Sequence, residues 1–308
     1  MTRYIAKRIL YKIPVLLGVT LLVFFIMHLA PGNVAAMILG ENATKEQIAA
    51  LEAEMGLDRP LLIQYLDYLL GLLHGDLGTS YTTGASVTSE IMARFPYTVV
   101  LTLVAAVVSI LLALPLGILA AVKQNTWVDN VSMVVSLIGV SMPIFWLAVM
   151  LILFFSLKLG WFPVYGANSW DSIVLPAISL GFMNMASIAR TTRSSMVETI
   201  RQDYIRTAYA KGLSKGTIIM RHAFRNGMLP TITVIGLEIG QMLGGSVLTE
   251  TVFAWPGVGR LMIQSINGRD TPMVMGCIIL MTICFSFVNL IVDLLYGVVD
   301  PRVRTMYR

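Results

Sequence analysis

The side chains that could carry covalent chemistry are few and scattered along the chain. His28, His74 and His222 have no metal-ligand spacing. No Gly-Lys dipeptide occurs, which excludes a P-loop for ATP, and neither a Gly-x-Ser-x-Gly motif nor a zinc-protease motif is present. Cys277 and Cys284 would lie about 10 Å apart along a helix, which is too far for a disulfide. We therefore expect no enzyme, no catalytic residue, no metal site and no cofactor in this chain.

One polar segment, residues 203–230, lies between two apolar stretches, has a dense positive charge and could act by docking on a partner. Its pattern predicts a helix from Tyr204 to Lys211, ended by Gly212 in a left-handed conformation. Ser214 would cap a second helix, which Pro230 would terminate or convert into the next apolar stretch. A solvated loop that only orients the neighbouring helices is the alternative, and the segment by itself favours neither.

The first of these two helices has the composition of a docking element. Ala208 and Ala210 are small enough to let a partner approach closely, while Arg206, Tyr209 and Lys211 offer charge and an aromatic ring. The predicted docking residues are Tyr204, Ile205, Arg206, Thr207, Ala208, Tyr209, Ala210, Lys211, Gly212 and Leu213.

The composition predicts a polytopic membrane protein. Of the 308 residues, 56% are hydrophobic and only 13% are charged. The mean hydropathy is +0.78, well above that of a soluble domain. The apolar runs do not alternate with polar residues as the strands of a barrel would, so they predict an all-α fold with six transmembrane helices. These runs are residues 13–30, 97–122, 131–157, 173–189, 229–252 and 272–299.

The lysines and arginines predict the orientation. They gather in segments 1–12 and 190–228 and at the C-terminus, whereas most acids fall in the segments between, so we expect both termini in the cytoplasm of a multi-pass inner-membrane protein. The net charge of +5 is then explained by the membrane topology and does not indicate nucleic-acid binding. The predicted organisation is a cytoplasmic N-terminus (1–12), a first transmembrane helix (13–30), an external segment (31–96) and a core of five transmembrane helices (97–308) that contains a cytoplasmic segment (190–228).

The external segment has two helical patterns of its own. Thr44 begins the first, and an amphipathic run that starts at Leu57 gives the second. A small cap that touches a soluble partner and an interfacial helix that lies on the lipid headgroups explain this pattern equally well.

Polar residues and prolines interrupt several predicted spans. Pro115 and Pro143 each remove a backbone hydrogen bond, which favours a packing kink or a break beside a translocation route. Asn289 and Asp293 form a polar pair in the last span, where their closeness to its cytoplasmic end favours a structural role over a transport role.

The fifth predicted span has two opposite faces on a helical wheel. Glycines recur every four residues on one face, the spacing that allows close helix packing, and polar groups occupy the other. A carboxylate near mid-membrane costs about 2.5–3.5 kcal/mol, so Glu238 should face water, a partner charge or a solute, with an ion pair across a subunit interface as the structural alternative. The predicted packing residues are Gly236, Gly240 and Gly244, and the predicted path residues are Glu238, Gln241, Gly245 and Thr249.

A series of short motifs covers nearly the whole chain and resembles the permease subunits of ATP-binding-cassette importers, in the branch that takes up dipeptides, oligopeptides, glutathione and nickel. Their order and spacing carry the resemblance. The motifs are Ile13-Pro14 with Leu29-Ala-Pro-Gly32, Gly56-Leu-Asp-Arg-Pro60 with Gln64-Tyr65, His74-Gly-Asp-Leu-Gly78, Ser141-Met-Pro-Ile-Phe-Trp146, Thr191-Thr-Arg-Ser-Ser-Met196, Trp255-Pro-Gly-Val-Gly259, and Asn289-Leu-Ile-Val-Asp-Leu-Leu295 with Asp300-Pro-Arg302.

In this family the segment around Gly212 is the coupling segment, which docks into a groove on a cytoplasmic ATPase. The general importer motif has Glu-Ala-Ala six residues before its glycine, whereas this chain has Arg206-Thr-Ala208, a departure typical of the peptide and nickel branch. Tyr209 stands where that branch often has arginine, so no particular salt bridge is carried over to it.

The resemblance implies a type I importer bundle and a set of partners. These are a second homologous permease, two cytoplasmic ATPases that bind ATP and magnesium, an external solute-binding protein and membrane lipid, with no nucleic acid. The solute would be a dipeptide or oligopeptide, or alternatively nickel, a metal chelate or glutathione. A self-contained channel or secondary transporter is the competing class.

Overall fold

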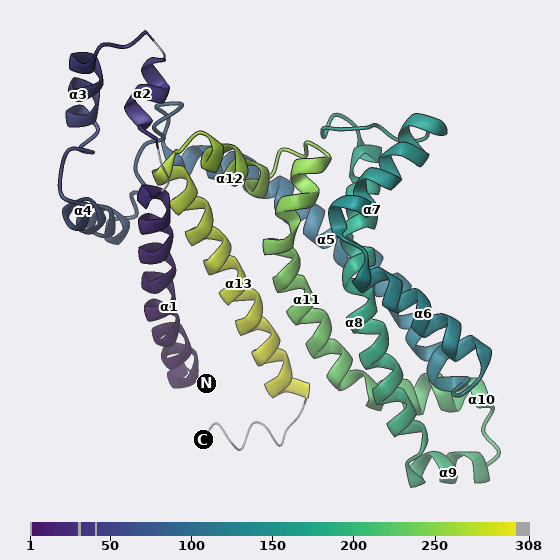
Figure 1. Cartoon of the computed structure of the whole chain (residues 1–308). Helices are drawn as coiled ribbons and strands as arrows, with labels where there is room; N and C mark the ends of the chain where they lie inside the picture. The colour runs from purple at the N-terminus through teal and green to yellow at the C-terminus, as the bar shows by residue number, and fades with distance from the viewer. Residues whose placement is uncertain (1, 30–31, 41, 300–308) are drawn as a thin grey trace. The chain divides into compact units, whose positions relative to one another are not determined.

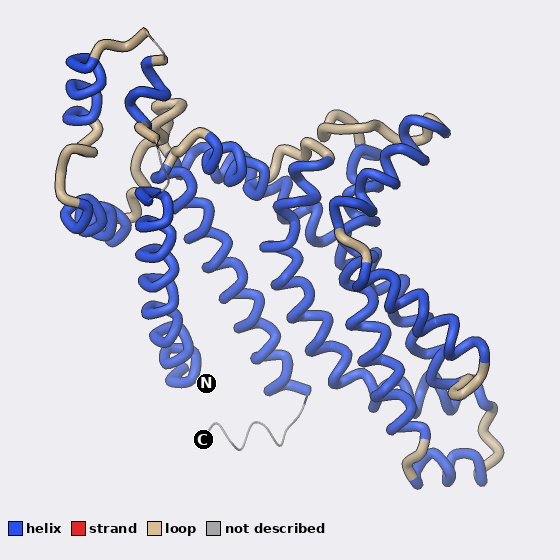
Figure 2. Tube along the Cα trace, in the orientation of Figure 1, coloured by secondary structure: helices blue, strands red, loops and turns tan. Residues whose placement is uncertain are grey.

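The computed structural model describes residues 2–29, 32–40 and 42–299, and these residues form helices joined by loops, with one isolated bridge between Thr79 and Ser86 (Figures 1 and 2). The predicted all-α class is confirmed. In this part of the chain five helices are long and apolar enough to cross a membrane, or six if one bent pair is a single span. The contacts divide the chain into two units, residues 1–98 with 256–283 and residues 99–255 with 284–308.

The first unit contains the external segment predicted from the sequence. A helix begins at Thr44, as its sequence predicts, and the structure adds a capping box between Thr44 and Gln47. The second amphipathic pattern also forms a helix. The helices of this unit are α1 (Thr2–Leu29), α2 (Val34–Leu39), α3 (Lys45–Glu54), α4 (Leu61–Leu73), α12 (Val258–Asn267) and the first parts of α5 (Val87–Val122) and α13 (Thr271–Val299).

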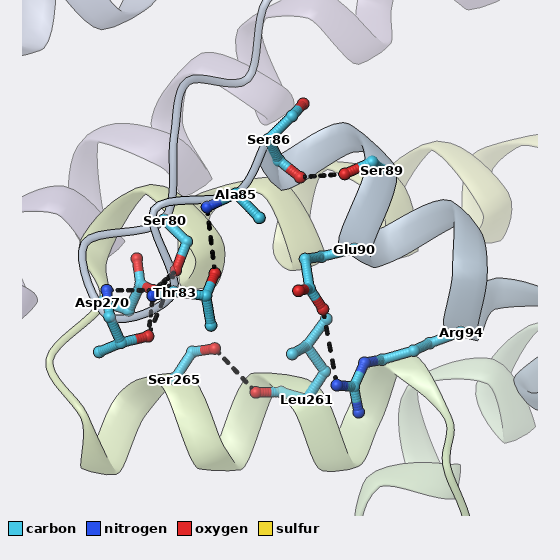
Figure 3. A network of polar contacts seen from close by, with 11 residues as sticks. Ser80, Thr83, Ala85, Ser86, Ser89, Glu90, Arg94, Leu261, Ser265 and Asp270 are labelled. Carbon is cyan, nitrogen blue, oxygen red and sulfur yellow. Dashed lines mark hydrogen bonds and ion pairs between the residues drawn. The ribbon is translucent and has the colours of Figure 1, made fainter.

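A buried carboxylate fastens a loop of the first unit to the start of α13. Asp270 is 1% exposed and accepts hydrogen bonds from the backbone N–H of Tyr81 at 3.1 Å and from Thr82 Oγ1 at 2.9 Å. The Ser80 hydroxyl also donates to Asp270, and Figure 3 shows the two side chains meeting. Burial and, second, the Asp270 charge raise the pKa of Tyr81 to about 12. The loop is therefore anchored by a fully hydrogen-bonded acid.

The second unit is built around α8, which packs against α6, α7 and α11. Glycine allows α5 and α8 to meet backbone to backbone, because a Cβ on Gly117 would lie 2.7 Å from the Ala189 carbonyl and one on Gly181 would lie 2.6 Å from the Ala105 carbonyl. The helices of this unit are α6 (Trp127–Ser141), α7 (Ile144–Leu151), α8 (Val174–Ile200), α9 (Asp203–Ala210), α10 (Lys215–Thr217), α11 (Phe224–Val252) and the later parts of α5 and α13.

The three prolines considered in the sequence behave differently. Pro143 breaks the third predicted span, because Met142 before it is extended (ψ 129°), and the two halves meet at 102°. α5 continues through Pro115, and α11 continues through Pro230. Of the two alternatives predicted for Pro230, the structure has the second, because the helix that Ser214 caps continues through Pro230 into the next apolar stretch.

Two boundaries also differ from the sequence-based expectation. α5 begins at Val87, so the last ten residues of the predicted external segment, 31–96, are already part of a long apolar helix. α10 and α11 join through a π-helical turn at Ile218–Ala223 into one run from Lys215 to Val252. The Asp293 side chain and the motif Asp300-Pro-Arg302 lie outside the described residues.

Candidate coupling site

The helix α9 has a well-defined start and end. Gln202 is extended and precedes the helix, and Gly212 follows it with φ +76°. The N–H of Gly212 donates to the Tyr209 carbonyl and the N–H of Leu213 donates to the Ala208 carbonyl, the paired bonds of a Schellman cap. Gly212 therefore supplies both the left-handed conformation and a donor that proline lacks. The next helix starts at Ser214, whose side chain accepts from the Thr217 N–H.

The inner face of α9 is fixed to the second unit by an apolar cluster. Ile205 is 1% exposed and Ala208 is 6% exposed, and both pack with Met196 of α8. The other buried members are Ala121, Ile218 and Ala223, which come from α5 and the π-helical turn. Ala208 is therefore small because its own chain surrounds it, which corrects the expectation that it lies against a partner.

The outer face of α9 is polar and aromatic. Tyr204 and Tyr209 are 41% and 47% exposed, and the Arg206 side chain is 79% exposed beside Asp203. Lys211 is exposed just after the helix. Figure 1 shows α9 lying across the end of α8, so this face is presented at one end of the second unit. Of the ten predicted docking residues, Ile205 and Ala208 pack into the apolar cluster described above, which we call the seat of α9, and the others are exposed.

A second set of contacts ties the start of α11 to α8 and α9. The Ser195 hydroxyl donates to the Gly227 carbonyl at 2.6 Å, and a Cβ on Gly227 would lie 3.1 Å from Thr199 Oγ1. The Asn226 side chain donates to the Tyr204 hydroxyl at 3.1 Å. Displacement of α9 would therefore be transmitted directly to α8 and α11.

An ion pair between α6 and α8 was not identified in the sequence. Arg193 Nε and Nη2 each lie 2.6 Å from an oxygen of Asp129, and the N–H of Asn125 donates to the same carboxylate at 3.0 Å. The Asp129 side chain is 3% exposed and that of Arg193 is 26% exposed. Asp129 and Arg193 lie just outside the predicted apolar runs 131–157 and 173–189, so no charge within a span signalled the pair. The pair fixes α6 to the helix that carries α9.

The polar face predicted for α11 is divided between two environments. Glu238 is 9% exposed and Thr249 is 1% exposed, and between them on the same arc Met242 packs with α5 and α8. Gln241 and Gly245 are exposed. Gln241 and Gly245 are therefore exposed on this arc and Glu238 and Thr249 are covered, and the assignment of the four residues to a path stays a prediction.

The glycine face of α11 is also divided. A Cβ on Gly236 would lie 2.2 Å from Val292 Cγ2 of α13, and one on Gly240 would lie 3.3 Å from the Phe285 ring. Gly244 has nothing within 4 Å of such an atom. Close contact with α13 thus involves the first two glycines.

Replacing Gly236 with alanine is expected to lower the thermal unfolding midpoint of the chain in detergent. The added methyl must displace α13 or force a rotamer change at Val292, an overpacking effect of about 1–3 kcal/mol. Gly244→Ala is the matched control, because open space and the better helix propensity of alanine, about 1 kcal/mol, predict an unchanged or higher midpoint. Equal destabilisation by both substitutions would contradict the assigned contact.

No group of three or more metal-ligating side chains occurs among the residues that the structure describes. What the structure does assemble is a short helix packed on α5, α8 and the π-helical turn that leads into α11.

Comparison with known proteins matches the chain along nearly its whole length. The model of the binding-protein-dependent transport system inner membrane component matches residues 113–305, and the model of the N-terminal region of these membrane components matches residues 1–102. The dipeptide transport system permease protein DppB of Alkalihalophilus pseudofirmus is 44% identical over 332 residues, which cover 99% of this chain and 100% of that protein. The glutathione transport system permease protein GsiC of Salmonella choleraesuis is 42% identical over 304 residues, 99% of each chain.

Two solved structures have a similar fold. A chain of the inward-facing MetNI methionine ABC transporter superposes with a TM-score of 0.59 at 18% identity, covering 68% of this chain and 96% of that one. A chain of an amino acid ABC transporter gives a TM-score of 0.53 at 17% identity, with coverage of 68% and 94%. At this identity the likeness concerns the helical fold alone.

Proposed function

Because the chain belongs to the family of binding-protein-dependent transport system inner membrane components, we propose that it is one of two permease subunits that form the membrane path of an ATP-driven peptide importer. It is a multi-pass membrane protein and not an enzyme of its own. The observation that carries the choice of solute is the 44% identity to a dipeptide permease over its full length. Dipeptides or oligopeptides are the proposed solutes.

The proposed partners follow from this assignment. A second homologous permease completes the path, an external solute-binding protein delivers the peptide, and two cytoplasmic ATPases bind ATP and magnesium. The exposed face of α9, with Tyr204, Arg206 and Tyr209, docks on one ATPase. Ile205 and Ala208 fasten α9 to the ends of α5 and α8. Closure of the ATPases therefore moves α9, and α9 passes this movement on to the helices of the bundle.

The proposed orientation has both termini in the cytoplasm and α3 outside. Ala50 is exposed on α3, so an Ala50→Cys variant, with Cys277 and Cys284 replaced by alanine, should react with an impermeant thiol reagent in intact cells. An Ala210→Cys variant on the exposed face of α9 is the control and should react only after lysis. The opposite pattern would reverse the topology.

Glutathione is the second candidate solute, because glutathione permeases are nearly as similar at 42% identity over 99% of both chains. Glutathione is itself a small peptide, so the two candidates differ in the binding protein more than in the permease.

Uptake by the reconstituted importer distinguishes the candidates. Proteoliposomes that contain the permease pair, its ATPases and its binding protein are expected to accumulate a labelled dipeptide only with ATP and magnesium, and excess unlabelled glutathione should compete weakly. Strong competition by glutathione, with little dipeptide uptake, would assign glutathione instead. Equal uptake without the ATPases would contradict the importer assignment and indicate a channel or secondary transporter.

A further inference from the structure

The amphipathic helix α4 is anchored to the middle of the first membrane-spanning helix. Tyr65 Oη lies 3.0 Å from Thr20 Oγ1 and donates to the Leu17 carbonyl at 3.2 Å. Tyr65 is 6% exposed and Thr20 is 1% exposed, and the Tyr65 ring packs on Phe24 with centroids 5.4 Å apart. Figure 1 shows α4 beside α1 in this unit.

The depth of this anchor follows from the length of the span. The apolar part of α1 follows Lys12 and runs from Ile13 to Leu29. At 1.5 Å per residue Thr20 lies about 10 Å from its start and about 14 Å from its end, which is deep within an apolar layer about 30 Å thick. This estimate holds for either orientation of the helix. The Tyr65 side chain is much shorter than half of that layer, so the backbone of α4 lies below the membrane surface.

The outward face of α4 is a leucine stripe. Leu62, Leu66, Leu70 and Leu73 are 63%, 49%, 56% and 82% exposed, at spacings of four, four and three residues. In water such a contiguous apolar face would be unfavourable, whereas at membrane depth lipid chains cover it. Asp67 lies off the stripe and pairs with Arg59 at 3.2 Å, so the charge on α4 is directed away from the leucines.

The backbone carbonyls at the C-terminal end of α4 and the Gln64 side chain are hydrogen-bonded within the protein, as a site with little water favours, whereas Tyr68 Oη is buried without a hydrogen-bond partner among the described residues. At its C-terminal end the Leu70 carbonyl lies 2.8 Å from His74 Nδ1, and the Gly71 and Leu72 carbonyls accept backbone N–H groups. On its protein-facing side Gln64 donates to two backbone carbonyls and lies 3.2 Å from His28 Nε2.

We propose that α4 is embedded in the bilayer leaflet that contains the C-terminal half of α1, with the leucine stripe of Leu62, Leu66, Leu70 and Leu73 covered by lipid acyl chains. The external segment is then held partly within the membrane by α4 and Tyr65.

Spin labels on the full chain in phospholipid nanodiscs test the proposal. Single cysteines at Leu62, Leu66 and Leu70, in a background without Cys277 and Cys284, should show severalfold more collisions with oxygen than with a water-soluble nickel chelate. A cysteine at Ala50 of α3 is the control for aqueous exposure and should show the reverse.

Three outcomes are distinguishable at the leucine positions. A high ratio of oxygen to nickel-chelate collisions supports the lipid-covered helix. Free access of the nickel chelate would place α4 in water and overturn the proposal. Low access of both reagents would overturn it as well, because a soluble partner or a second copy of the chain would then cover the stripe.

Discussion

Truncating Arg193 to alanine is expected to destabilise the helix bundle by about 1–3 kcal/mol, because the Asp129 carboxylate loses its cation while keeping the Asn125 N–H. Asp129→Ala should cost less, since the Arg193 side chain is 26% exposed and can reach water, whereas that of Asp129 is 3% exposed. The midpoint of thermal unfolding in detergent measures both effects.

A neutral pair separates the lost charge interaction from lost packing. The double variant Asp129→Asn with Arg193→Gln keeps more side-chain volume than Arg193→Ala and removes both charges, so it should recover part of the stability that Arg193→Ala loses. No loss in either single variant would show that the pair does not hold α6 to α8.

An Ala208→Trp variant is expected to insert into the membrane and to lose transport. Ala208 lies in the apolar cluster that seats α9 with only 6% of its surface exposed, so an indole ring at this position cannot fit without lifting the helix from Met196 and Ile218. Uptake by the reconstituted importer should fall to background. Normal uptake would exclude the assigned seat.

The same substitution two residues later is the matched control. Ala210 is exposed, so Ala210→Trp should leave α9 seated. Limited trypsin digestion of the isolated chain distinguishes a lost seat from a blocked docking face. Cleavage at Arg206 and Lys211 should accelerate in Ala208→Trp, which frees the helix, and stay unchanged in Ala210→Trp. If Ala210→Trp also loses uptake while its digestion is normal, the outer face itself docks on the ATPase.

Local sequence patterns were sufficient to predict that the chain is a membrane protein, that its apolar runs form helices and where several of these helices end. Long apolar runs predict spanning helices because the bilayer leaves no other partner for the backbone, and Gly212 and Ser214 predict the caps of the coupling segment because each acts on its nearest neighbours. The helix that begins at Thr44 follows from the same short-range chemistry. The permease family could likewise be inferred from the order of short motifs along the chain.

Only the tertiary structure decided which face of each helix meets which neighbour. A helical wheel gives the phase of Glu238 and Ala208 but not the identity of what lies beside them. The structure buries both, and Ala208 packs in a cluster with residues of α5 and α8. The ion pair of Asp129 and Arg193 could not be predicted for the same reason, because the two residues are 64 positions apart in the sequence. The contact of Tyr65 with Thr20 could not be predicted either. It is a hydrogen bond between two helices, and the composition of neither helix indicates it.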